Sequence, residues 1–203
     1  MTNIAHSKVT HLYDSSEAGG KREAILKAAL QLFTERGFHG TAMPLVAELA
    51  GVGAGTIYRY FESKEALVNT LYRDWKEFQL ATILRDMPPE APLREQFHIY
   101  WNRLADFAKE YPTAFGFLEL HFHAPYLDEK SRAIEERGHN AMVGYFQECL
   151  RQQVVRDAPA EVLGSLVMGA YIGLVKASRN GCLELTRDVL DQAEECCWAA
   201  IRR

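Results

Sequence analysis

The sequence lacks several features that would assign it to common classes of protein. Its four cysteines show neither CxxC nor metal-ligand spacing, so we predict reduced thiols that mostly pack as small hydrophobic groups: Cys149, Cys182, Cys196 and Cys197. A redox sensor at the adjacent pair Cys196 and Cys197 stays open as an alternative. The N-terminus has no hydrophobic signal segment, and the longest apolar run, Val162–Val175, is too short to cross a bilayer. We therefore expect a cytoplasmic protein that does not contact a membrane.

The chain also lacks a strong basic excess, an alternating strand pattern, internal repeats and low-complexity tracts. Its 203 residues carry a net charge of −4, which excludes a uniformly basic nucleic-acid binder. Hydrophobic residues make up 48% and charged residues 25%, as in an ordinary globular protein that buries a core. Apolar residues recur at helical spacing along most of the sequence, so we predict an all-α fold.

No Ser/His/Asp, Cys/His or phosphate-loop signature stands out, and we expect no cofactor and no enzymatic activity. A helical-bundle metalloenzyme is the alternative from another class. Two Glu-x-x-His pairs have the spacing that di-iron bundles place on facing helices, with one further glutamate as a candidate ligand: Glu95 with His98, Glu136 with His139, and Glu119. His121 and His123 are a candidate zinc pair, but residues two apart point to different sides of a helix. The ligand set for either metal is incomplete.

The most informative stretch is Thr41–Lys64, TAMPLVAELAGVGAGTIYRYFESK. It predicts two short helices joined by a turn at Gly51 and followed at once by the start of another helix. Ala47, Gly51 and Ile57 supply the small residue, the turn glycine and the apolar plug of a helix-turn-helix. We therefore predict that the helix beginning near Ala54 lies on the surface, where it can read DNA.

GVGAGTIYRYFESKEAL resembles the GVSxGTxYxxFxSKExL signature of the TetR family of bacterial transcriptional regulators. The preceding AILKAALQLFTERGFHGTA is similar to that family's first helix, so the resemblance covers Arg22–Leu71, about a quarter of the chain. It implies a homodimer that binds a DNA operator, most often as a repressor, and leaves the operator when a small molecule binds the C-terminal body. Gly53 and Ala54 depart from the pattern, which has a serine and often a longer polar residue at these positions.

A disordered arm and a three-helix head are predicted at the N-terminus. Residues 1–20 are polar and without periodicity, so we expect them to be disordered. The DNA-binding domain, residues 21–85, begins with a helix over Lys21–Arg36 and continues into the helix-turn-helix, with Thr41 as N-cap. A long fourth helix then reaches about Arg85 and joins the head to the body.

Residues 86–203 are predicted to form a helical-bundle domain for ligand binding and dimerisation. The proline-rich segment Met87–Pro92 marks its start. We expect five helices, at Leu93–Glu110, Pro112–His121, Asp128–Val155, Pro159–Asn180 and Thr186–Arg203.

The DNA contacts follow from the general rule that phosphate contacts supply affinity and base edges supply specificity. The resemblance implies phosphate contacts from Thr41, Thr56, Tyr58, Tyr60 and Lys64. Arg59 can reach guanine O6 and N7, with a phosphate contact as the alternative, and core packing is an alternative for Tyr58. Ala54 and Gly55 can offer thymine-methyl contact or a close backbone approach. Residues 21–64 contain six lysines and arginines against four glutamates, an excess suited to a DNA-binding head.

The predicted body is rich in aromatic residues, and bundle interiors often hold small-molecule pockets. Most of these aromatics are individually expected to be ordinary core. We expect an apolar or aromatic effector to be bound among ten residues: Trp101, Leu104, Phe107, Phe117, His121, Phe122, Met142, Tyr145, Phe146 and Tyr171. In the family that the sequence resembles, an effector bound there tilts the fourth helix and changes the spacing of the two heads.

The last two helices are predicted to hold the dimer together. The segment Val162–Val175 is apolar nearly all round, which in a protein of this size indicates cover by a partner subunit. The resemblance implies the same, because TetR-like proteins pack these two helices into a four-helix bundle across a two-fold axis. The expected contact residues are Leu166, Ala170, Leu174, Val189, Ala193, Cys197 and Ala200. The operator of such a dimer is expected to be pseudo-palindromic.

Overall fold

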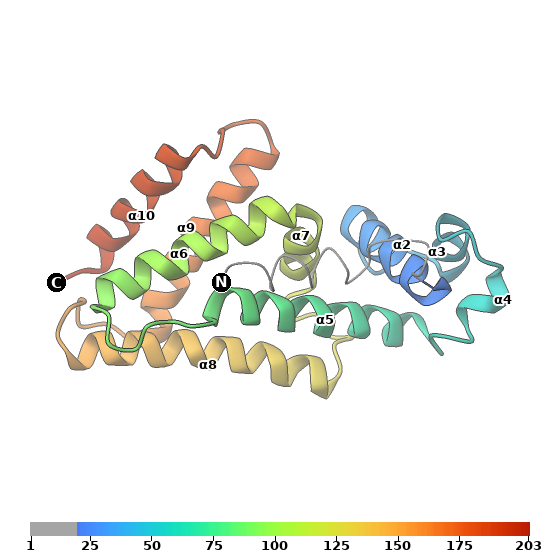
Figure 1. Cartoon of the computed structure of the whole chain (residues 1–203), viewed down its shortest axis with the longest axis horizontal. Helices are drawn as coiled ribbons and strands as arrows, with labels where there is room; N and C mark the ends of the chain where they lie inside the picture. The colour runs from blue at the N-terminus through green and yellow to red at the C-terminus, as the bar shows by residue number, and fades with distance from the viewer. Residues whose placement is uncertain (1–19) are drawn as a thin grey trace. The chain divides into compact units, whose positions relative to one another are not determined.

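The computed structural model describes residues 20–203, which contain nine α-helices and no strand (Figure 1). The predicted all-α class is therefore confirmed. The predicted disordered arm, residues 1–20, lies outside the described residues except for Gly20.

The chain divides into two compact units, each assembled from segments that are distant in sequence. The first combines the chain up to Arg85 with Asp106–Glu135, and the second combines Asp86–Ala105 with Glu136–Arg203. The segment Asp106–Glu135, which the linear division assigned to the body, thus packs in the same unit as the head. The functional division into residues 21–85 and 86–203 stays a prediction.

The head consists of α2 (Lys21–Arg36), α3 (Met43–Leu49) and α4 (Ala54–Ile57). The inward face of α2 is apolar, and Gly37 ends the helix at a φ of +67°, a conformation that favours glycine. The predicted capping role of Thr41 was wrong, because Ala42 is the N-cap of α3 and makes no side-chain capping bond. Pro44 follows in the first turn, where its missing N–H costs little.

The fourth predicted helix is α5 (Lys64–Leu84), and its start is fixed by a local cap. The hydroxyl of Ser63 accepts a hydrogen bond from the Ala66 N–H at 3.0 Å, which satisfies one of the free amides of the first turn. α7 (Pro112–His121) packs against both α2 and α5 in this unit. The contacts are largely aromatic, with the rings of Phe33 and Phe117 6.5 Å apart between α2 and α7.

The second unit draws on α6 (Leu93–Glu110), α8 (Glu129–Arg151), α9 (Ala160–Arg179) and α10 (Arg187–Ile201). Trp101 is fully buried and donates its indole N–H to the Leu190 carbonyl at 3.1 Å, which joins α6 to α10. α9 approaches α8 closely at Gly164, where an added Cβ would lie 2.5 Å from the Met142 sulfur. Glycine therefore permits this helix crossing.

Two expectations about the last helices need correction. α8 ends at Arg151 rather than Val155, because Gln153 takes a left-handed φ of +57° and Val155 forms an antiparallel bridge with Arg202. α9 is a 20-residue helix, and its length and hydropathy meet the criterion for a membrane span, with 28% of that window buried. The shorter apolar run Val162–Val175 understated its length. An apolar interface helix meets the same criterion.

Candidate nucleic-acid interface

The turn between α3 and α4 has the geometry of a helix-turn-helix. Gly51 takes a φ of +66°, which favours glycine. Its N–H bonds the Glu48 carbonyl at 3.0 Å, and the Val52 N–H bonds the Ala47 carbonyl at 2.9 Å. Ile57 is fully buried and anchors α4 from below. The predicted roles of the small residue, the turn glycine and the apolar plug fit this arrangement.

α4 is shorter than a typical recognition helix. It has α-helical geometry only over Ala54–Ile57, and its N-cap Gly53 contributes no side-chain bond. Tight turns follow, in which the Arg59 N–H bonds the Thr56 carbonyl at 3.1 Å and the Tyr60 N–H bonds the Ile57 carbonyl at 3.1 Å. Arg59 was expected on the helix and instead lies in these turns.

Most of the predicted DNA-binding side chains lie together on the exposed side of this segment. Ala54, Gly55 and Arg59 are exposed, and Thr56 is half-buried. Tyr58 and Tyr60 are large aromatic residues with exposed fractions of 54% and 43%, values at which core packing does not explain them. Their hydroxyl groups can donate to phosphate oxygens.

Thr41 and Lys64 hold the head together from within. Thr41 is 1% exposed, and its hydroxyl is directed inward to the Leu32 carbonyl at 3.1 Å and the Gly37 carbonyl at 2.9 Å. Lys64 is half-buried; its ammonium donates to the Phe38 carbonyl at 2.9 Å and the Thr41 carbonyl at 3.1 Å, and lies 4.2 Å from the Phe38 ring centre. Thr41 therefore does not present its hydroxyl for a phosphate contact. Two of the three Lys64 donors serve the head.

The predicted ligand-binding residues are divided between the two units. In the first unit Phe107, Phe117 and His121 are buried, whereas Phe122 is 52% exposed. Burial lowers the pKa of His121 to about 4, and a main-chain interaction with Phe33 offsets only part of this shift. His121 is therefore neutral at physiological pH, and its Nδ1 lies 2.5 Å from the Tyr126 hydroxyl.

The six ligand candidates in the second unit are aromatic or apolar side chains around α6, α8 and α9. Their polar groups are engaged internally: the Tyr145 hydroxyl donates to the Leu93 carbonyl at 2.8 Å, and the Tyr171 hydroxyl donates to the Leu104 carbonyl at 3.2 Å. Met142 and Tyr145 are half-buried, and the other four are buried: Trp101, Leu104, Phe146 and Tyr171.

α9 and α10 each have a buried face and an accessible apolar face. The buried face of α10 carries Leu190, Glu194, Trp198 and Ile201. The predicted dimer residues lie on the accessible faces: Leu166, Ala170 and Ala200 are exposed, and Leu174, Val189, Ala193 and Cys197 are half-buried. Leu166 is 58% exposed, and Val162 beside it is 46% exposed. A partner surface is the usual reason for such a pattern.

The metalloenzyme alternative receives no support from the part of the chain that the structure describes. Within residues 20–203 no three His, Cys, Asp or Glu side chains are grouped to hold a metal ion. The His98 ring instead contacts the buried carboxylate of Glu194 at 2.7 Å, and Glu95, Glu136 and His139 are exposed.

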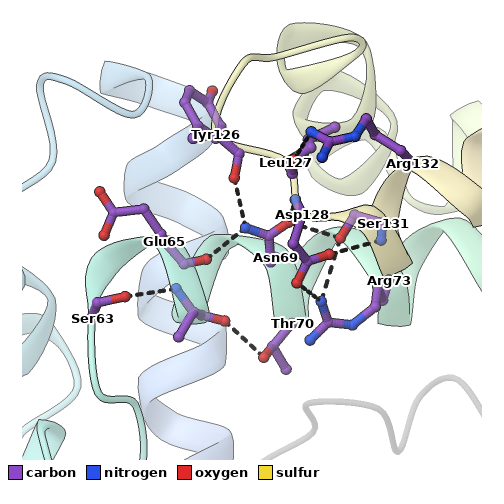
Figure 2. A network of polar contacts seen from close by, with 11 residues as sticks. Ser63, Glu65, Asn69, Thr70, Arg73, Tyr126, Leu127, Asp128, Ser131 and Arg132 are labelled. Atoms are coloured by element: carbon purple, nitrogen blue, oxygen red, sulfur yellow. Dashed lines mark hydrogen bonds and ion pairs between the residues drawn. The ribbon is translucent and has the colours of Figure 1, made fainter.

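The sequence analysis missed a buried polar cluster in the first unit. Asn69 is 3% exposed on α5, between the fully buried Val68 and Leu71, and it bonds residues near the start of α8 (Figure 2). A polar amide within an apolar helical stripe is a signal for such a cluster. Its partners, 57 to 62 positions away, were not visible from local patterns.

The fold and the turn geometry define a helix-turn-helix protein. A family model described as the tetracyclin repressor-like C-terminal domain matches residues 74–203, and a model of the bacterial regulatory proteins of the tetR family matches residues 25–71. The chain belongs to the TetR family of transcriptional regulators.

Individual relatives agree with this assignment. The HTH-type transcriptional regulator RutR of Escherichia coli K12 is 37% identical over 103 residues, which cover 49% of this chain and 47% of RutR. The chain thus matches about half the length of this relative. An uncharacterized HTH-type regulator of Haemophilus influenzae is 24% identical over 182 residues, 89% of this chain and 95% of that protein.

Solved structures share the fold. A TetR-family regulator from Marinobacter aquaeolei has a TM-score of 0.78 at 22% identity and covers 90% of this chain and 95% of its own. The ketosteroid regulator KstR2 of Mycobacterium tuberculosis has a TM-score of 0.74 at 17% identity, with 92% and 97% covered. At these identities the likeness concerns the fold alone.

Proposed function

We propose that this protein is a cytoplasmic DNA-binding repressor that acts as a homodimer and leaves a pseudo-palindromic operator when an apolar or aromatic effector binds its body. The observation that carries the proposal is the exposed cluster Tyr58, Arg59 and Tyr60 directly after a helix-turn-helix. Two tyrosine hydroxyls and one guanidinium on one short segment suit phosphate and base-edge contacts. Paired copies of this segment can enter successive major grooves.

The dimer part of the proposal rests on the accessible faces of α9 and α10. Leu166 and Val162 expose apolar surface on a helix with high mean hydropathy, and the small residues Ala170 and Ala200 permit close helix approach. A second copy presenting the same faces covers this surface by two-fold symmetry.

The DNA-binding test begins with selection of duplexes from a random pool, followed by fluorescence anisotropy titration of the best sequence. Arg59→Ala is expected to weaken binding by about tenfold to a hundredfold and to relax the sequence preference, as loss of one bidentate base contact does. Arg156→Ala removes an exposed arginine outside the head and is the matched control, expected to bind as the unaltered protein. Equal affinities of all three proteins for the selected duplex would contradict the placement of the interface.

The dimer test compares two leucines of similar exposure. Leu166→Glu places a charge on the accessible face of α9, and we expect a monomer in sedimentation velocity. Leu120→Glu alters a leucine that is 53% exposed on α7 and is expected to leave the dimer intact. A dimer that persists in Leu166→Glu at micromolar concentration would refute this interface.

A further inference from the structure

The side-chain amide of Asn69 joins α5 to the start of α8. Its nitrogen donates to the Glu65 carbonyl at 2.9 Å and the Tyr126 carbonyl at 2.8 Å. Its oxygen accepts from the Asp128 N–H and the Ser131 hydroxyl, both at 2.8 Å (Figure 2). An amide offers two donors and accepts two bonds, so these four contacts satisfy it fully. A buried network of this kind favours one arrangement of its helices.

Asp128 and Arg73 strengthen the same junction. One carboxylate oxygen of Asp128 accepts the Ser131 N–H at 2.8 Å in the first turn of α8, and the other pairs with the Arg73 guanidinium on α5 at 2.6 Å (Figure 2). Arg132 also donates to the Leu127 carbonyl. The turn at 122–128 and the start of α8 are therefore held to α5 by several independent bonds.

Tyr126 extends this junction to the head. Its ring stacks on Phe38 with centroids 3.9 Å apart and planes 17° apart. Phe38 lies between α2 and α3, and its carbonyl accepts the Lys64 ammonium. On its other side, the Tyr126 hydroxyl meets the neutral ring of His121 at the end of α7. One tyrosine thus contacts the end of α7, a carbonyl partner on α5 and the segment just before the helix-turn-helix.

We propose that Asn69, Tyr126, Asp128 and Ser131 form a brace that positions the DNA-binding head, so that a displacement of α7 or of the start of α8 alters DNA affinity through Phe38. This rests on the proposed function. Asn69 and Tyr126 are positioning residues rather than DNA contacts, because Asn69 is buried and both side chains are used within the first unit. The network supplies the contiguous packing and bonding through which coupling passes between an effector-sensitive helix and the head.

Native-state hydrogen exchange tests the brace without DNA or effector. In Asn69→Ala and in Tyr126→Leu, amides at 122–131 and also at 37–60 are expected to exchange about tenfold faster or more, because the head loses its support. Thr70→Ala is the matched control: Thr70 bonds only the Ala66 carbonyl within α5, at 2.8 Å, so head exchange should not change. If faster exchange is confined to 122–131 in both variants, the brace does not position the head.

A salt titration on the selected duplex distinguishes positioning from contact. Asn69→Ala is expected to bind about tenfold more weakly with an unchanged slope of log affinity against log salt, since no phosphate contact is lost. Lys64→Ala is the comparison variant, in which a lost phosphate contact would reduce the slope by about 0.9. A reduced slope in Asn69→Ala would overturn the positioning role. If the unaltered protein binds no selected duplex, the proposed function fails while hydrogen exchange still decides the brace.

Discussion

The two compact units use different chemistry to hold together helices that are far apart in sequence. In the first unit the neutral amide of Asn69 joins α5 to α8 with every donor and acceptor used. In the second unit Glu194 on α10 is 2% exposed and pairs with Arg94 at 2.5 Å and with His98 on α6. A neutral network loses one bond at a time, whereas a buried carboxylate depends on its cation. The two junctions should therefore respond differently to substitution.

Removal of the cation in the second unit is expected to have the largest effect. Arg94→Met keeps an unbranched chain beside the rings of Phe97 and Trp198 but leaves Glu194 buried with only His98. The free energy of unfolding in urea should fall by about 3 kcal/mol. Arg187→Ala is the control, because Arg187 and Asp191 form a surface pair with exposed fractions of 53% and 50%, expected to matter by less than about 0.5 kcal/mol. Equal losses in the two variants would remove the contrast.

Acid should weaken the first unit through His121. Its pKa is about 4 in the folded protein against 6.5 in the unfolded chain, so the unfolded state binds more protons between these values. Stability is then full above about pH 6.5 and falls as the pH drops toward 4. Between pH 7.5 and pH 5 the loss should be about 2 kcal/mol by urea unfolding. His121→Gln should flatten this dependence, and an equally steep fall in that variant would assign the acid sensitivity to another group.

Loss of a single bond in the neutral network should have the smallest effect. Ser131→Ala removes one of two bonds to the Asn69 oxygen and leaves the bond from the Asp128 N–H. Thermal unfolding should show a loss of about 1 kcal/mol. Thr70→Ala removes a hydroxyl that bonds within α5 and should change stability by less than about 0.5 kcal/mol. A loss in Ser131→Ala as large as that in Arg94→Met would show that the two junctions do not differ.

Local signals in the sequence predicted the helices well, because the residues that end them act locally. Gly37 and Gly51 have the left-handed conformations expected of them, and Ser63 caps α5. Thr41 misled because its hydroxyl bonds carbonyls of α2 and the following turn, nine and four positions earlier, instead of capping α3. The candidate DNA interface was predictable for the same reason as the helices: its residues lie within one short segment.

Features that depend on distant partners could not be predicted. The pairing of Asn69 with Asp128 and Ser131, and of Arg94 with Glu194, joins positions about 60 and 100 apart. The inclusion of Asp106–Glu135 in the first unit has the same origin. Helical periodicity shows which face of a helix is apolar, but it does not identify the helix that covers that face.

The single α-helical turn of α4 has a consequence for attempts to redesign sequence preference. Because Tyr58, Arg59 and Tyr60 follow in tight turns, they do not advance by the regular 100° rotation of a helix. Side chains transplanted here position by position from a regulator with a longer recognition helix would project in altered directions. A successful graft must carry its own backbone from Gly53 to Phe61 along with the side chains.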